Sequence, residues 1–152
     1  MIREAVAADA PLLARLLREA FEEYRGRLDP PSSAHDKTEE VVLRELKDGG
    51  ALISESPSGA EGCVFFHVKP DHVYLDRLAV LPPYRGRGVA RALMEAVESR
   101  ARALGSTPVR LNVRLALKDH QDWYARQGYA FLSYGTHAGY SAPTFVVLQK
   151  SL

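Results

Sequence analysis

The sequence predicts a mixed α/β fold in which strands outnumber helices and one sheet holds parallel and antiparallel strands. Two observations carry this prediction. Apolar segments of strand length alternate with amphipathic helical segments along the chain. At positions 51–69 and 129–150, strands follow one another across turn-rich segments, as antiparallel neighbours do. The predicted order is β-α-α-β-β-β-α-β-α-β-β, in a single three-layer domain over residues 1–152.

The first third of the chain predicts one strand and two helices. Met1 to Ala7 is a short strand, and Asp9 caps a helix that has Pro11 in its first turn. Arg25 to His35 is rich in proline and serine and predicts a loop, which precedes a weaker helix over Asp36 to Lys47. The apolar residues of the first helix recur at helical spacing: Leu12, Leu13, Leu16, Leu17, Ala20, Phe21 and Tyr24.

The middle of the chain predicts a hairpin and then a buried strand. Ala51–Glu55 and Gly62–Lys69 flank a turn over Ser56–Gly59. The apolar run Tyr74–Val80 predicts a strand that ends before Pro82, because proline donates no hydrogen bond to a sheet.

A long amphipathic helix follows this strand. It is expected to end at Gly105, because glycine readily adopts the left-handed conformation of a helix stop. Glu98 and Arg102, four residues apart, are expected on its solvent side. Its apolar stripe is predicted to hold Val89, Leu93, Ala96, Val97, Ala101 and Leu104.

The last third predicts a strand, a short helix that stops at Gly128, and a strand pair. The strand alternates apolar and polar residues, so one of its faces is buried. These elements are expected at Val109–Leu115, Asp119–Gln127, Tyr129–Tyr134 and Pro143–Lys150, with a loop over Gly135–Ala142.

The turn before the long helix has the features of a phosphate site. A helix N-terminus exposes unpaired N–H groups and a partial positive charge. Gly86 and Gly88 let a ligand approach the backbone, and Arg85, Arg87 and Arg91 add positive charge. A Rossmann fingerprint would place its glycines directly after the strand, and a Walker loop needs G-K-S or G-K-T, so neither motif describes this turn.

Leu78-Ala79-Val80, followed by Pro82 and by Arg85-x-x-Gly88-x-Ala90, resembles the acetyl-CoA-binding core R/Q-x-x-G-x-G/A of the GNAT (GCN5-related) N-acetyltransferases. The order of elements also matches this family along nearly the whole chain. The resemblance implies that the strands before and after the long helix splay apart around the pantetheine arm of acetyl-CoA. It also implies the residues that bind acetyl-CoA: Leu78, Ala79 and Val80 for pantetheine, and Arg85, Gly86, Arg87, Gly88, Val89 and Ala90 for the pyrophosphate.

Asp122–Tyr129 resembles the family segment in which a helix tyrosine precedes an arginine-x-glycine-aromatic turn. Tyr124 falls on that tyrosine and is expected to protonate the departing CoA thiolate, because a neutral phenol with a pKa of about 10 can donate a proton. Packing beside Trp123 is the structural alternative. Where the family often has an asparagine and an alanine, this chain has Leu117 and His120.

Asp76 is the candidate general base. An alkyl amine with a pKa of about 10.4 is mostly protonated at neutral pH, so a base must take a proton. GNAT enzymes often carry an acidic residue at this position, and a salt bridge to Arg77 is the structural alternative. Strict strand alternation places Asp76 on one face with Tyr74, Leu78 and Val80. Three other carboxylates are alternatives that could instead bind a cationic acceptor: Glu22, Glu23 and Asp29.

Composition argues against several classes of function. The net charge of +1 disfavours a general nucleic-acid or membrane binder, and no apolar run reaches membrane length. The single cysteine, Cys63, allows no intrachain disulfide, so we expect a buried thiol in a cytoplasmic protein. The five histidines have no metal-ligand spacing, and no metal is expected. His120 and His137 remain candidates for the mouth of the acceptor site.

These observations lead to the hypothesis of an acetyl-CoA-dependent N-acetyltransferase. A primary amine on a small molecule or a peptide would attack the thioester directly, entering between the loops Tyr24–His35 and Gly135–Pro143. Homodimers are common in the family, so a homodimer is possible. Two alternatives stay open: a non-catalytic module that binds or senses acyl-CoA, and a nucleotide-binding regulator that would bind NAD or ATP.

Overall fold

A computed structural model describes residues 1–105 and 107–152, and these form a seven-stranded sheet in the order β1-β2-β3-β4-β5-β7-β6. β4 and β5 run parallel, and the other neighbouring strands run antiparallel. The predicted element order and the mixed sheet are thereby confirmed. The strands are β1 (Ile2–Glu4), β2 (Gly50–Ser56), β3 (Gly59–Val68), β4 (Val73–Val80), β5 (Val109–Arg114), β6 (Ala130–Gly135) and β7 (Phe145–Lys150).

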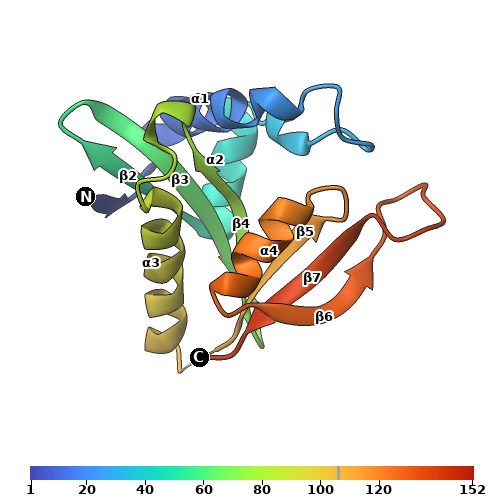
Figure 1. Ribbon diagram of the computed structural model, residues 1–152. Coiled ribbons are helices and arrows are strands. Elements are labelled where there is room, and N and C mark those ends of the chain that lie inside the picture. Colours follow the sequence, from blue (N-terminus) through green and yellow to red (C-terminus); the bar gives the residue numbers. More distant parts are fainter. Residues whose placement is uncertain (106) are drawn as a thin grey trace.

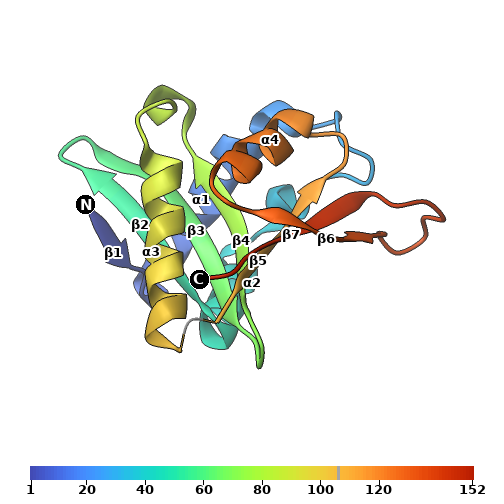
Figure 2. The ribbon, with the colours of Figure 1, turned by 60° about the horizontal axis from the view of Figure 1, so that its bottom comes forward.

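Helices cover both faces of the sheet (Figures 1 and 2). α1 and α2 lie on one face of β2–β4, α3 lies on the opposite face, and α4 lies beside β5. Within the described residues, no helix is both long enough and apolar enough to cross a membrane. The α-helices are α1 (Ala10–Phe21), α2 (Glu39–Asp48), α3 (Val89–Ala103) and α4 (Lys118–Arg126).

Each face of the sheet has its own hydrophobic core. Successive strand residues point to opposite faces, so Phe65 packs in the core under α1 and α2 while Phe66 packs in the core under α3. Cys63 is fully buried beside Phe65, as expected, and burial raises the pKa of its thiol to about 12. The apolar face of α1 fills the same core with Ala10, Leu13, Ala14, Leu16, Leu17 and Ala20.

One predicted helix cap and one predicted helix start are wrong, although α1 begins directly after Asp9 with Pro11 in its first turn, as predicted. The Asp9 carboxylate does not cap α1, because it accepts hydrogen bonds from the Val6 N–H at 2.8 Å and from the Arg3 guanidinium at 2.8 Å. The second helix begins at Glu39 rather than at Asp36, because the Thr38 hydroxyl caps it. A short 3-10 turn over Ser33–Asp36 takes the place of the expected first helical turn.

Glu98 of α3 and Leu104, the residue that follows α3, also differ from their predicted places. Glu98 is 2% exposed instead of lying on the solvent side, and it accepts hydrogen bonds from the Tyr129 hydroxyl at 2.9 Å and from the Lys150 ammonium at 3.2 Å. Leu104 is 54% exposed, because the helix ends at Ala103 and Leu104 has left the helical stripe. α3 is therefore attached to β7 through a buried carboxylate.

Candidate active site

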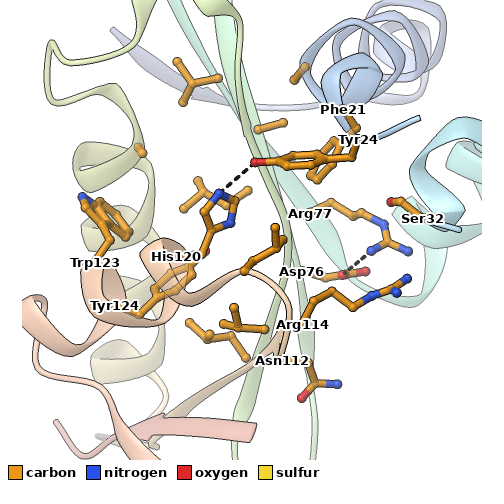
Figure 3. A pocket seen from close by; sticks show the side chains of 18 of the residues that line it. Phe21, Tyr24, Ser32, Asp76, Arg77, Asn112, Arg114, His120, Trp123 and Tyr124 are labelled. Atoms are coloured by element: carbon orange, nitrogen blue, oxygen red, sulfur yellow. Dashed lines mark hydrogen bonds and ion pairs between the residues drawn. The ribbon is translucent and has the colours of Figure 1, made fainter. Parts of the chain in front are cut away.

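The sheet opens between its two parallel strands. Among the described residues, β4 and β5 pair only where Val73 meets Val109 and Tyr74 meets Arg110. Beyond these pairs the strands diverge, which confirms the splay that the family resemblance implies. A cavity of about 1010 Å³ lies at this opening and is lined by β4, β5, α4 and the start of α3 (Figure 3). The edge of β4 that faces the cavity therefore offers main-chain groups that β5 does not use.

A β-bulge in β4 sets which side chains face the cavity. Arg77 has a φ of +52°, in the left-handed region, and it shifts the register between β3 and β4. Before the bulge, Asp76 lies opposite Phe65; after it, Leu78 packs into the core under α3. The expectation that Asp76 shares a strand face with Leu78 and Val80 is therefore wrong, because the extra residue breaks strict alternation.

The turn at the start of α3 borders the same cavity. Gly86 and Gly88 have φ values of +76° and +82°, and a Cβ at either position would meet no atom within 4 Å. Glycine is favoured here by backbone conformation, and both residues leave open space in front of the main chain. No side chain caps the helix start at Gly88. The first N–H groups of α3 therefore remain available to an anion.

The arginines of this turn differ in what they contact. The Arg85 guanidinium donates to the Val80 and Ala20 carbonyl oxygens at 3.0 Å each and pairs with Glu23 at 2.5 Å, so it joins the end of α1 to the end of β4. Arg87 lies 5.9 Å from the Tyr84 ring centre and does not line the cavity. The turn would thus bind an anion mainly through hydrogen bonds from main-chain N–H groups rather than through the guanidinium groups of Arg85 and Arg87.

Tyr124 of α4 lines the same cavity as this turn. Its ring makes edge contacts with Trp123 and Tyr129, at 5.0 and 6.0 Å between ring centres. Within the described residues, its hydroxyl has no hydrogen-bond partner. Burial raises the pKa of Tyr124, and the nearby Asp76 carboxylate raises it further. The phenol therefore stays protonated across the neutral range and is free to donate a proton.

His120 lines the cavity beside the 3-10 turn Glu22–Tyr24, which follows α1. Its Nε2 lies 2.8 Å from the Tyr24 hydroxyl, and the two rings meet edge to face (Figure 3). Burial lowers the pKa of His120, so its imidazole is neutral near neutral pH. His137 also lines the cavity, and its Nδ1 is hydrogen-bonded to Thr144. Both histidines that were candidates for the acceptor mouth therefore border the cavity.

The structure brings nearly all predicted site residues to one place. Arg77, Asn112 and Arg114 also line the cavity, and the sequence interpretation did not select them. The alternation of β5 identifies Asn112 and Arg114 as a polar face, but the splay decides that this face is open to a ligand. The cavity is lined by every predicted site residue except Arg87: Asp76, Leu78, Ala79, Val80, Arg85, Gly86, Gly88, Val89, Ala90 and Tyr124.

The family of the chain follows from a match to a protein-family model. The model of the Acetyltransferase (GNAT) family matches residues 11–129, which include the splayed strands, the glycine turn and Tyr124. The chain belongs to this family. No curated protein sequence matches the chain significantly. The matched residues include most of those that line the cavity.

Three solved structures with the same fold are named as N-acetyltransferases and have low sequence identity to this chain. The PaiA N-acetyltransferase of Thermoplasma acidophilum, solved in complex with coenzyme A, is 19% identical, with a TM-score of 0.83 over 100% of this chain and 98% of that chain. A GCN5-related N-acetyltransferase of Rhodopseudomonas palustris is 22% identical, with a TM-score of 0.79 over 100% and 95%. The ribosomal-protein-S18-alanine N-acetyltransferase of Escherichia coli is 17% identical, with a TM-score of 0.77 over 99% and 92%. These likenesses establish the GNAT fold, and the family match establishes an acyltransferase.

Proposed function

We propose that residues 1–152 form one N-acetyltransferase domain that transfers an acetyl group from acetyl-CoA to a primary amine by direct attack. One observation carries the proposal. The unpaired edge of β4, the open N-terminus of α3, Tyr124 and Asp76 all border a single cavity. The proposal includes a cytoplasmic location, which rests on the single cysteine, and a homodimer, which rests on family resemblance alone.

The residues of the cavity fit acetyl-CoA. The open space in front of Gly86 and Gly88 suits a pyrophosphate, which the first N–H groups of α3 would bind. The β4 edge at Leu78, Ala79 and Val80 suits the amides of the pantetheine arm, because main-chain groups pair with amides as a neighbouring strand would. When bound, acetyl-CoA supplies the acetyl group as an activated thioester. A main-chain N–H at Val80 or its neighbour would donate to the carbonyl oxygen of that thioester.

Tyr124 and Asp76 would move the protons. The Tyr124 hydroxyl would donate its proton to the CoA sulfur, and Asp76 would take a proton from the amine, directly or through water. Asp76 lines the cavity, and its ion-pair contact with Arg77, at 3.6 Å, is longer than the contacts that hold the other carboxylates. Glu23 is paired with Arg85, Glu22 is paired with Arg25 at 2.9 Å outside the cavity, and the Asp29 carboxylate, also outside it, accepts from the Tyr140 hydroxyl.

Thermal unfolding with four ligands tests the proposal. A ligand that binds only the native state raises the Tm, so acetyl-CoA and CoA should raise it while NAD and ATP should not. Release of free thiol from acetyl-CoA with a panel of amines then measures catalysis. A Tm shift without thiol release from any amine would favour the non-catalytic acyl-CoA-binding module. No shift with acetyl-CoA or CoA at saturating concentration would contradict the function altogether.

Gly88→Ala is expected to weaken CoA binding. A Cβ in the left-handed region costs about 1 kcal/mol, and relief of that strain would move the first N–H groups of α3. We expect the Kd for CoA to rise about tenfold, measured by isothermal titration calorimetry. Gly59→Ala is the matched control, because Gly59 also has a positive φ and open space but lies in the β2–β3 hairpin. Equal Kd values for the two variants would argue against the phosphate role of the turn.

Asp76→Asn is expected to lower kcat/KM at neutral pH by about tenfold or more, because the amine loses its proton acceptor. The loss should shrink as the pH rises toward the amine pKa of about 10.4, where free amine becomes abundant without help. The pH–rate profiles of wild type and variant measure this. Asp71→Asn is the control, since Asp71 is an exposed carboxylate bonded to His72 outside the cavity. A loss that stays constant at every pH would rule out the base role.

A further inference from the structure

Two arginines from the two splayed strands face the same end of the cavity. Arg77 comes from the bulge of β4, and Arg114 comes from the last position of β5. Figure 3 shows both guanidinium groups beside Asp76, on the side of the cavity away from Trp123. Because β4 and β5 have separated by this point, neither side chain is covered by the neighbouring strand. The pair lies where the loop over residues 25–38 borders the cavity.

These guanidinium groups are held mainly by neutral oxygens. Arg114 donates to the Pro30 carbonyl oxygen at 2.6 Å and to the Pro31 carbonyl oxygen at 3.2 Å. Arg77 donates to the Ser33 hydroxyl, and its Nε is buried without a partner among the described residues. An arginine has five N–H donors, so both side chains keep donors that no protein group uses.

The charges around the cavity leave this end positive. Two of the arginines that line the cavity form ion pairs with glutamates: Arg85 with Glu23 at 2.5 Å and Arg91 with Glu95 at 2.9 Å. Arg77 and Arg114 are left with Asp76, which lies 3.6 Å from the Arg77 guanidinium. The charged residues that line the cavity are Glu23, Asp76, Arg77, Arg85, Arg91 and Arg114.

Among the charged residues that line this end of the cavity, Arg77, Arg114 and Asp76 leave a surplus of about one positive charge. Burial lowers the pKa of Arg114, and the charge of Arg77 lowers it further, against the smaller opposing effects of Tyr140 and Asp29. Asp29 does not line the cavity. The two arginines thus repel each other, and an anion between them would relieve that repulsion.

The backbone at Arg77 gives an independent indication. Arg77 is the one non-glycine residue with a positive φ in the described part of the chain. This conformation is unfavourable for an L-residue with a long side chain, and such residues cluster at functional sites. Here the strained residue is the one that directs a guanidinium group into the cavity. The bulge therefore places a strained residue in the lining of the cavity.

We propose that the acceptor is an amine that also carries a carboxylate, as a free amino acid does, and that Arg77 and Arg114 bind this carboxylate. The inference rests on the proposed acetyltransferase function and adds the substrate class. The planar guanidinium group of arginine can donate two parallel hydrogen bonds to a carboxylate, and a surplus of one positive charge suits a monoanion. Asp76, adjacent to Arg77, faces the amine of the same molecule. Carboxylate and amine would thus be bound by groups of opposite charge at neighbouring positions.

Matched acceptors test the inference. Glycine, alanine, phenylalanine and glutamate are each compared with their carboxamides and their decarboxylated amines, and phosphoethanolamine is added as an amine with a phosphate. The measurement is kcat/KM for thiol release from acetyl-CoA, with mass spectrometry of the product. We expect at least one amino acid to exceed both of its counterparts by about tenfold or more. The carboxamide has the less basic amine, so the chemistry alone would favour it.

Arg77→Gln and Arg114→Gln should each lower kcat/KM for the amino acids more than for their carboxamides, so that the preference for the carboxylate is lost. A purely structural role of Arg114 in holding Pro30 and Pro31 would lower the rates with all acceptors together. Arg110→Gln is the matched control, because Arg110 lies on the same strand but contacts Gln149 outside the cavity. The Arg110→Gln variant should prefer the amino acid over its carboxamide as strongly as wild type does.

Several outcomes would overturn the inference. These are a preference for the carboxamides or for the decarboxylated amines, a preference for phosphoethanolamine, or a carboxylate preference that survives both substitutions. If CoA binds but no amine is acetylated, the proposed function fails. The inference is then tested separately, by the binding of amino acids to the CoA-saturated protein. In that case, an amino acid must raise the Tm of the CoA-saturated protein more than its carboxamide does, and Arg77→Gln must remove the difference. Equal shifts would overturn it.

Discussion

Replacing Tyr124 by phenylalanine is expected to lower kcat by about 100-fold, because general acid catalysis contributes rate factors of this size. The ring and its contacts with Trp123 and Tyr129 remain, so the Kd for CoA should change little. The pH dependence follows from the pKa of Tyr124, which burial and the Asp76 carboxylate raise above its ordinary value of about 10. A group with a raised pKa keeps its proton to higher pH. The wild-type kcat should therefore show no decline from Tyr124 ionisation below about pH 10.

Steady-state kinetics at saturating acetyl-CoA, paired with calorimetric titration of CoA, separate chemistry from binding. Tyr134→Phe is the control, because Tyr134 is 61% exposed on β6 and outside the cavity. A Tyr124→Phe enzyme with the kcat of wild type would remove the proton-donor role. If kcat is kept while the Kd for CoA rises, Tyr124 would instead be a residue that contacts the sulfur without donating a proton.

Glu98→Ala is expected to destabilise the protein by about 2 kcal/mol or more, because it leaves the buried Tyr129 hydroxyl and the half-buried Lys150 ammonium without their acceptor. The Tyr129 hydroxyl and the Lys150 ammonium both donate to Glu98, which joins α3 to β7 and to the turn after α4. For a chain of this size, each kcal/mol lowers the Tm by roughly 2–4 °C. Urea and thermal unfolding measure the loss of free energy of unfolding.

Glu95→Ala is the control for this substitution. Glu95 lies on the same helix and pairs with Arg91, but this pair is exposed, and such helix pairs contribute only about 0.3–0.5 kcal/mol. Glu98→Gln keeps the side-chain volume and an acceptor for Tyr129, so it should lose less stability than Glu98→Ala. Equal stability of Glu98→Ala and wild type would mean that the buried group contributes nothing to the fold.

Local pattern predicted most of the fold. Strand alternation, helical stripes and glycine stops act over a few residues, and they located the elements and their order. The errors at helix starts have local causes that the sequence also contains. Thr38 is a better N-cap than His35, which precedes Asp36. The Asp9 carboxylate is hydrogen-bonded to the Arg3 guanidinium and does not cap α1. Periodicity could also have found Glu98, which is four residues after Met94 and three before Ala101, both buried.

The candidate site was predicted less completely, because part of it depends on register and on distant partners. The bulge at Arg77 depends on how β4 pairs with β3, and one extra residue moves Leu78 and Val80 to the other face from Asp76. Likewise, Arg85 was selected for its charge, but Glu23 and the Ala20 carbonyl oxygen, which are distant in sequence, occupy much of its guanidinium group. The glycines were easier to place, since their role is set by the local backbone.

The short pairing between β4 and β5 has a mechanical consequence. In the described part of the chain, the sheet has two parts, β1–β4 and β5–β7, which are joined by two residue pairs between β4 and β5. α3, through the contacts of Glu98 with Tyr129 and Lys150, forms a brace across the gap between these two parts. Few hydrogen bonds join β4 to β5, so the two parts of the sheet separate locally most easily where these strands diverge. A ligand bound between β4 and β5 would contact both parts of the sheet. It would therefore stabilise the protein most where the sheet itself has the fewest hydrogen bonds.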